Sequence, residues 1–257
     1  MNTENKNEYD LYSLIFDQQT NQKNDSGKNE NIQRQNKSNE KFFFEENETE
    51  TCRMVFNDSE NKTHRYYACY NITYENKNET NNKTLTFIMF NPSNSTLDQT
   101  DPTLENCLAI AKNAKYNKVE IVNLYSYIGS KVQSNKKLGE IKNKNDVEYT
   151  PEQKINHDFL LKLIDNDNKN SERDFLKAWG WGKKNNKYSM INKVNNKLNK
   201  KINKSKNNVF YLSINDEGIE ELKKKILHPA KSIWNVLGGI KYATLKTVNT
   251  NDTQETK

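Results

Sequence analysis

The chain has 257 residues, of which 33% are hydrophobic and 29% charged, and its formal net charge is +6. A mean hydropathy of −1.10 is too low for a chain that packs along its whole length. No apolar run is long enough to cross a membrane and no signal peptide opens the sequence, so we expect a cytoplasmic protein without a membrane partner. We expect one α/β domain over residues 41–245, between disordered polar tails at 1–40 and 246–257.

Asparagine and lysine dominate the composition, and only four of the 40 basic residues are arginine. This bias makes a single Asn or Lys uninformative and gives each arginine more weight. Charge is unevenly spread: residues 1–50 carry a net charge of −5, whereas residues 183–206 hold nine lysines and no acidic residue. The three cysteines, Cys52, Cys69 and Cys107, are too widely spaced for a metal knuckle, and we expect reduced thiols.

In the first half of the chain, the sequence indicates a short helix or no regular structure at residues 10–17. Strands are expected after it. Residues 10–17 (DLYSLIFD) are the one apolar island of the N-terminal tail. Residues 52–56 and 65–74 indicate an antiparallel hairpin around a polar turn. Residues 85–90 indicate a buried strand that stops at Asn91-Pro92-Ser93, because proline cannot continue a ladder.

After this strand, helices and strands alternate. Asp101 and Pro102 suit the N-cap and first position of a helix, and another helix begins at Pro151. Further predicted elements are strands at 118–125, 174–179 and 209–214, a polar loop at 128–150, and a helix at 188–202. The alternation predicts an α/β three-layer sandwich with a mainly parallel sheet and the N-terminal antiparallel hairpin at its edge.

Candidate site residues follow the predicted strands, because parallel strands end at one edge of a sheet and ligands bind in the crevice there. The candidates are Asn91, Pro92, Ser93, Asp98, Asp101, Asn123, Trp179, Gly180 and His228. Each has a simpler interpretation: a turn for Asn91-Pro92, a helix cap for either aspartate, core packing for Trp179, and a surface position for His228. Arg65 stands apart, since a strand that begins with one of four arginines favours a contact with a carboxylate or phosphate.

The helix predicted at 188–202 carries a row of lysines on its outer face. Lys193, Lys197, Lys200 and Lys201 would suit the phosphates of a nucleic acid, and equally a solvated helix surface. A glycine-rich phosphate loop, a nucleophile elbow and a histidine-rich metal cluster are all missing from the sequence. We therefore expect neither a metal nor a cofactor, and we do not expect nucleoside triphosphate hydrolysis.

Six motifs in order resemble a known family. They are Arg65-Tyr66, FIMFNPS at 87–93, DPT at 101–103, NLY at 123–125, AWG at 178–180 and HP at 228–229. Together they resemble the domain of unknown function 1643 family over residues 52–231, which implies an α/β domain of unassigned biochemistry. The chain is more distantly similar to the uracil-DNA glycosylase superfamily, α/β proteins with a strand that runs into a Pro-containing polar loop and a late His-Pro-Ser loop.

Three functions remain open at this point. In a glycosylase-like or other nucleotide-directed enzyme, Asn91 contacts the base or a water, Asp98 or Asp101 activates that water, and His228 stabilises the departing anion. A non-catalytic nucleotide or nucleic-acid binding module would use the same edge through Arg65, Pro92, Ser93, Asn123, Trp179 and Gly180. The third is a protein that binds a small metabolite or a protein partner. The sequence does not decide between them, nor does it give the oligomeric state.

Overall fold

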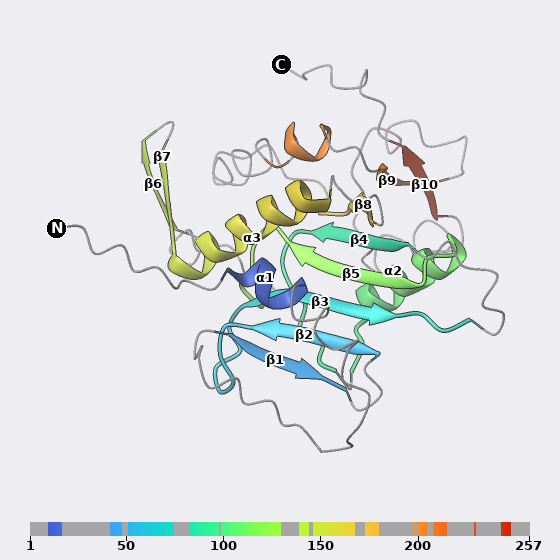
Figure 1. Ribbon diagram of the computed structural model, residues 1–257, viewed down its shortest axis with the longest axis horizontal. Helices are drawn as coiled ribbons and strands as arrows, with labels where there is room; N and C mark the ends of the chain where they lie inside the picture. Colours follow the sequence, from blue (N-terminus) through green and yellow to red (C-terminus); the bar gives the residue numbers. More distant parts are fainter. Residues whose placement is uncertain are drawn as a thin grey trace.

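The computed structural model describes residues 10–16, 42–47, 51–74, 83–97, 99–129, 139–143, 146–167, 173–179, 198, 200–204, 208–214, 229 and 243–247. Its centre is an eight-stranded sheet with the order β1-β2-β3-β5-β4-β8-β9-β10 (Figure 1). The strands are β1 (Phe43–Glu46), β2 (Cys52–Phe56), β3 (Arg65–Asn71), β4 (Thr84–Met89), β5 (Lys118–Asn123), β8 (Arg173–Lys177), β9 (Val209–Ile214) and β10 (Ala243–Thr247).

The sheet is mixed. Its central strands β5, β4, β8 and β9 are parallel neighbours, as expected for strands joined by helices. On one side β3 pairs antiparallel with β5, and on the other side β10 pairs antiparallel with β9. The α/β class is confirmed, but antiparallel flanks on both sides of the parallel centre mean that the sheet is not mainly parallel. The predicted hairpin is β2–β3, and β1 lies outside it, so the hairpin sits one strand in from the edge.

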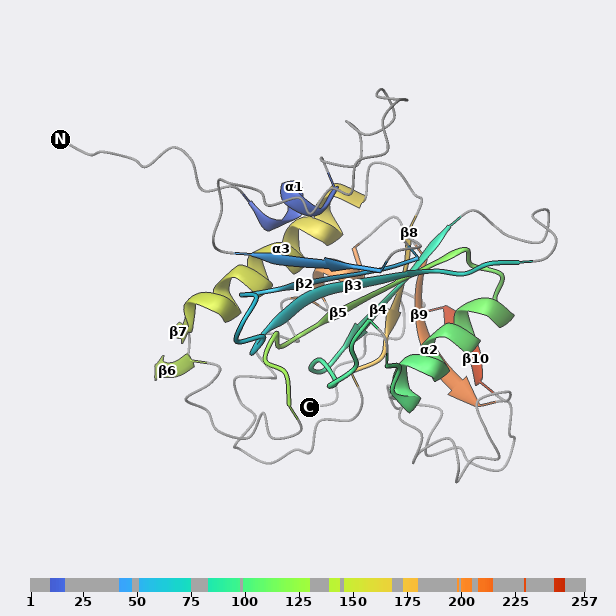
Figure 2. The same ribbon diagram turned by 90° about the horizontal axis from the view of Figure 1, so that it is seen from below.

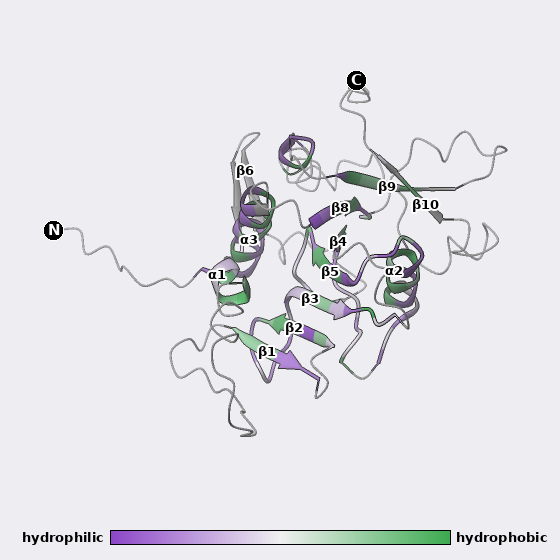
Figure 3. Ribbon diagram, turned by 45° about the vertical axis from the view of Figure 1, so that its right-hand side comes forward, coloured by the Kyte–Doolittle hydropathy of each residue, from purple (hydrophilic) through white to green (hydrophobic). Residues whose placement is uncertain are grey.

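Helices cover both faces of the sheet (Figure 2). α2 (Pro102–Asn113) packs on one face, where Leu104, Cys107 and Ile110 join a buried cluster with strand residues such as Phe87. α1 (Leu11–Phe16) and α3 (Pro151–Asp167) pack on the other face, in a separate cluster. In Figure 3 both α2 and α3 carry hydrophobic and hydrophilic stretches, as expected for helices between a sheet and solvent. We refer below to the α2 side and the α3 side of the sheet.

Several expected boundaries differ from the structure. The predicted loop 128–150 contains a two-stranded hairpin of β6 (Gly139–Asn143) and β7 (Asp146–Tyr149), whose polar sequences lack the apolar alternation of a half-buried strand. α1 lies inside the segment expected to be disordered, at its apolar island, and β10 crosses the expected boundary at residue 245. The predicted helix 188–202 falls mostly outside the described residues, of which Leu198 and Lys200 to Ile202 are helical.

The crossovers define a switch point between β4 and β8. β4 leads through α2 on one face to β5. After β8, the described residues on the way to β9 include Trp179, Leu198 and Ile202, which pack on the other face, in the α3-side cluster. The chain therefore leaves the carboxyl ends of β4 and β8, which are neighbours, toward opposite faces. In open α/β sheets this divergence creates the crevice in which ligands bind.

A buried ion pair occupies the opposite, amino-terminal half of the parallel strands. Glu120 is fully buried, and its carboxylate accepts hydrogen bonds from Arg173 Nε (2.7 Å), Tyr67 Oη (2.8 Å) and Thr86 Oγ1 (2.9 Å). Burial favours the neutral form, but Arg173 and then Lys118 outweigh it and hold the pKa of Glu120 at about 2. The ring of Phe16 in α1 lies 5.1 Å from the Arg173 guanidinium, so the N-terminal helix closes over this pair.

Lys177, near the end of β8, gives a prediction for stability at high pH. It is 5% exposed, and its Nζ donates to Asn203 Oδ1 at 2.6 Å, with no carboxylate partner among the described residues. Burial lowers its pKa from 10.5 to about 8, so between these values the folded protein binds fewer protons than the unfolded chain. Stability due to this group therefore rises as pH increases through that interval.

We expect Lys177→Met to be more stable than the wild type at pH 7, with the difference shrinking by pH 9.5. Urea denaturation of both proteins at pH 7, 8.5 and 9.5 measures this difference. The other titratable groups are the same in both proteins, so their contributions cancel in the comparison. A stability difference that stays constant over this range would mean that the Lys177 ammonium has a compensating partner in the folded protein.

Candidate functional site

A β-bulge at the start of β3 aims Arg65 at the α2 side. In the β2–β3 ladder Val55 pairs with Tyr67 and Phe56 pairs with Arg65, so Tyr66 is an extra residue on β3. Tyr66 and Tyr67 consequently both join the α3-side cluster. The side chain of Arg65 turns to the α2 side, where it reaches Met54 Sδ at 3.9 Å.

Arg65 is a buried cation that is bonded to neutral groups. It is 3% exposed, and its Nη1 donates to the backbone oxygen (2.9 Å) and Oγ (3.1 Å) of Ser95, while Nη2 donates to Ser93 Oγ at 3.4 Å. Among the described residues no carboxylate bonds to it. Burial lowers the pKa of Arg65, and the nearby Asp101 carboxylate is one of the charges that act in the opposite direction. A buried guanidinium in this state favours an anion in its vicinity.

Asn91, at the end of β4, ties two loops together. Its Nδ2 donates to Gly129 O at 2.8 Å and to Pro92 O at 3.2 Å, which joins the loop after β4 to the loop after β5. Gly129 has a φ of 140°, a conformation that favours glycine. The amide protons of Asn91 are therefore engaged in positioning the loop, and Pro92 is buried behind it.

Asp101 is the N-cap of α2, as predicted. Its Oδ1 accepts from the backbone N–H groups of Thr103 (2.8 Å) and Leu104 (2.9 Å). Its Oδ2 is buried and has no hydrogen-bond partner within the described part of the chain. The second carboxylate oxygen thus remains available at the carboxyl edge of the sheet.

Asn123, the last residue of β5, lies 1% exposed beside Met89. It alternates with Val119 and Ile121 of the α2-side cluster, which places its side chain on that side. Neither its Oδ1 nor its Nδ2 has a hydrogen-bond partner among the residues that the structure describes. A buried amide with both groups unpaired is costly and therefore calls for a functional explanation.

Two residues of α3 that the sequence did not single out hold the chain after β5. Asn156 Nδ2 donates to the backbone oxygens of Asn123 (2.9 Å) and Leu124 (3.2 Å), and Gln153 Nε2 donates to Leu124 O at 2.8 Å. Both side chains are buried. Their signal in the sequence is the presence of polar side chains on the inner face of a helix that also carries the buried apolar residues Phe159, Leu160, Leu163 and Ile164.

Unpaired buried polar atoms gather at this edge of the sheet. On the α2 side, within the described ranges, they belong to Arg65, Asp101 and Asn123; further buried oxygens without a partner are those of Tyr125, Ser126 and the Asn156 carbonyl. They lie at or just after the carboxyl end of β5, at the start of β3, at the N-cap of α2, or in the second turn of α3. The ion pair in the amino-terminal half of the strands is, by contrast, fully bonded. Among the described residues, the carboxyl edge is therefore where buried polar atoms lack hydrogen-bond partners.

The remaining candidate residues lie either on the other face of the sheet or outside the described residues. Trp179 packs in the α3-side cluster, on the opposite face from Arg65. Pro229 O accepts from Asn106 Nδ2 of α2 at 2.7 Å, so the residue after His228 returns to the α2 side. Asp98, Gly180 and His228 lie outside the described residues.

The lysine face is only partly described. Lys193 and Lys197 lie outside the described residues, and Lys200 is exposed. Lys201 forms an ion pair with Asp165 of α3, which compensates part of the positive charge. In the described ranges no cluster of three His, Cys, Asp or Glu side chains could hold a metal ion, and none of the described helices has the length and apolarity to span a membrane.

These features define an α/β protein whose parallel strands diverge at a switch point, with uncompensated polar groups around their carboxyl ends. The chain belongs to the family described as "Protein of unknown function (DUF1643)", whose sequence model matches residues 70–229. This match confirms the family resemblance, but it begins after Arg65 and so leaves the first part of the β2–β3 hairpin outside. No curated protein and no solved structure matches the chain significantly.

Proposed function

We propose that this protein binds a nucleoside or nucleotide at the carboxyl ends of β4 and β5, on the α2 side. The observation that carries the proposal is the buried amide of Asn123, whose donor and acceptor are both unpaired within the described structure. An asparagine amide can pair with the adjacent donor and acceptor atoms of a nucleobase edge. Arg65 supplies positive charge nearby.

Hydrolysis of an N-glycosidic bond is the chemistry that we propose for this ligand. Asp101 Oδ2 is a carboxylate oxygen without a hydrogen-bond partner among the described residues, and it would take a proton from a water that adds to C1′ of the sugar. The base would leave with the bonding electron pair, and His228 would stabilise that anion. The choice of reaction follows the resemblance of Asn91-Pro92-Ser93 and His228-Pro229 to the two loop motifs of the uracil-DNA glycosylase superfamily.

Calorimetric titration of the full chain with the four common nucleosides and their 5′-monophosphates tests binding. We expect Asn123→Ala to weaken the best ligand by at least about tenfold, because a bidentate amide contact discriminates by about 1–3 kcal/mol. Asn113→Ala, at an exposed position near the end of α2, is the matched control and should bind like the wild type. If none of these compounds binds, the proposal is wrong.

Release of free base from nucleosides and from uracil-containing single- and double-stranded DNA tests the reaction. Asp101→Asn is the informative variant, because asparagine is an equally good N-cap and keeps α2 in place. We expect it to bind ligand but to release no base. Binding by the wild type without any release would instead establish a non-catalytic nucleotide-binding module.

A further inference from the structure

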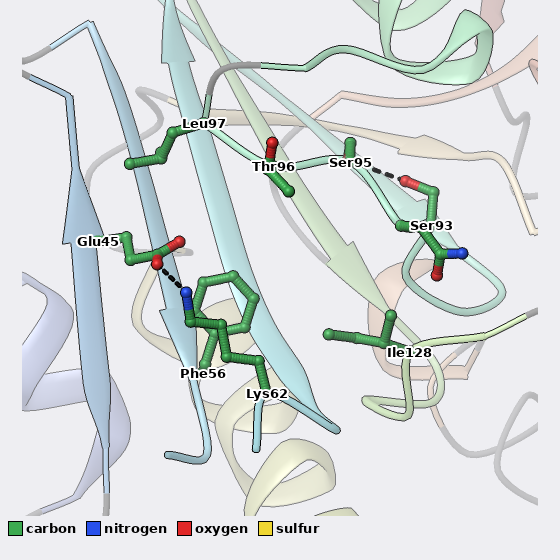
Figure 4. Close-up of a pocket in the computed structure, with 9 residues that line it drawn as sticks. Glu45, Phe56, Lys62, Ser93, Ser95, Thr96, Leu97 and Ile128 are labelled. Atoms are coloured by element: carbon green, nitrogen blue, oxygen red, sulfur yellow. Dashed lines mark hydrogen bonds and ion pairs between the residues drawn. The ribbon is translucent and has the colours of Figure 1, made fainter. Parts of the chain in front are cut away.

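A pocket of about 410 Å³ adjoins the proposed site, between the β1–β2 strands and the loop after β4. Figure 4 shows Glu45, Phe56 and Lys62 along one side, with the 93–97 loop and Ile128 across from them. The volume lies in the range of small-molecule sites, and the lining combines apolar side chains with a few polar groups. Ser93 and Ser95, which line this pocket, are the residues that Arg65 contacts from behind.

Lys62 supplies positive charge to the pocket, and an incoming anion can replace its ion-pair partner, Glu45. Its ammonium pairs with Glu45 and lies 5.4 Å from the ring centres of Phe43 and Phe56. The two charged side chains are 37% and 21% exposed, respectively. A pair this accessible to water contributes little to stability, so an anion in the pocket can take the place of the Glu45 carboxylate at small cost.

Arg65 makes the opposite wall a hydrogen-bond donor. A guanidinium can only donate, so the hydroxyl oxygens of Ser93 and Ser95 both act as acceptors toward it. The two hydroxyls lie 3.0 Å apart, and one of their two protons forms the bond between them. The other proton is left for an acceptor in the pocket. The wall thus favours a ligand with negatively charged oxygens.

We propose that this pocket is an anion subsite for the phosphate of a nucleotide. Lys62 exchanges Glu45 for the phosphate, and the Ser93–Ser95 pair donates a hydrogen bond to it. The identity of the ligand rests on the proposed function, and the subsite narrows that ligand to nucleotides in preference to nucleosides. In the unliganded protein Glu45 forms the ion pair with Lys62, and its carboxylate turns to solvent when the phosphate binds.

The test compares Lys62→Gln and Glu45→Gln in calorimetric titrations at low ionic strength, with inorganic phosphate, the four 5′-mononucleotides and the four nucleosides as probes. Loss of the Lys62 charge should weaken nucleotide binding about tenfold, since it removes one charge-assisted hydrogen bond from a partly exposed group. Loss of the competing Glu45 charge should strengthen it by about two- to fivefold. Nucleoside affinity should change in neither variant.

Matched controls remove the same charges away from the pocket. Glu46→Gln changes the exposed neighbour of Glu45 on β1, and Lys112→Gln changes an exposed lysine of α2. Both should leave nucleotide binding unchanged. Thermal unfolding of each variant, monitored by circular dichroism, checks that the variant is folded.

The outcomes separate the subsite from the function. Equal affinity for nucleosides and nucleotides, unchanged in Lys62→Gln, would overturn the subsite and leave the proposed function standing. Binding of inorganic phosphate that depends on Lys62, without binding of any nucleoside or nucleotide, would support the subsite and contradict the proposed function. If none of the probes binds, both are wrong.

Discussion

Asn123→Leu is expected to raise the free energy of unfolding by about 1–3 kcal/mol and to abolish ligand binding. The amide of Asn123 is buried with its donor and acceptor both unpaired in the described structure, so an apolar side chain of similar size removes an uncompensated desolvation cost. The same change removes the groups that we expect to contact the base. Urea denaturation and calorimetric titration of one variant measure both effects.

Asn156→Leu provides the control with the opposite sign. The Asn156 amide donates to the backbone oxygens of Asn123 and Leu124, and its loss leaves both without that donor. We expect it to lower the free energy of unfolding by about 1–3 kcal/mol. If Asn123→Leu were equally destabilising, the Asn123 amide would have a structural partner and the argument for a ligand would fail.

Arg173→Met should be among the most destabilising substitutions in the chain, with an expected loss of about 3–5 kcal/mol. It leaves the fully buried Glu120 carboxylate without its guanidinium, which donates through Nε at 2.7 Å and through Nη2 at 3.1 Å. Replacing both partners, in Glu120→Gln with Arg173→Met, should recover part of the loss because no uncompensated charge remains. Arg53→Met on β2, where the arginine lies over the Phe44 ring, is the matched control and should cost less than about 1 kcal/mol.

The pH dependence of the same pair follows from the pKa of Glu120. The folded value of about 2 lies below the ordinary value of 4.5, so this stabilisation is complete above pH 4.5 and is lost as pH falls toward 2. In Arg173→Met the pKa of Glu120 should rise, because the largest charge that opposes its burial is gone. The variant therefore gains on the wild type as the pH is lowered from 7 to 4, as measured by urea denaturation. A constant difference over that range would contradict the coupling.

Local sequence signals predicted the elements that have strong periodicity. The strands at 52–56 and 209–214 match β2 and β9 in their bounds, and the Asp101-Pro102 cap marks the start of α2. Strand order and the antiparallel flanks were not predictable from periodicity, because it records which face a residue occupies and not which strand lies beside it. The β6–β7 hairpin was not predicted, because its strands are polar and show no alternating apolar pattern.

The candidate site was predictable where a residue was unusual for its context. Arg65 stood out by scarcity and Asn123 by its apolar neighbours, and the structure places both side chains on the α2 side of the carboxyl edge. Lys62 and Glu45 gave no signal, since lysines and acids are common in this chain and the pair forms across 17 residues. Ser95 likewise became visible only through its contact with Arg65.

The bulge at Tyr66 has an evolutionary and an engineering consequence. A strand alternates its side chains, so the face on which Arg65 lies depends on the number of residues between it and Tyr67 as well as on its own identity. A regular strand that kept Tyr66 without the bulge would put Arg65 on the same face as Tyr67 and turn the guanidinium toward α3, away from Ser93 and Ser95, whereas deletion of Tyr66 would leave Arg65 opposite Phe56 on the α2 side. A relative that conserves the arginine two residues before the equivalent of Tyr67 but lacks the bulge would thus share the motif without sharing the site. The spacing of Arg65 from Tyr67, together with the bulge, is therefore the feature to compare when this site is traced through the family.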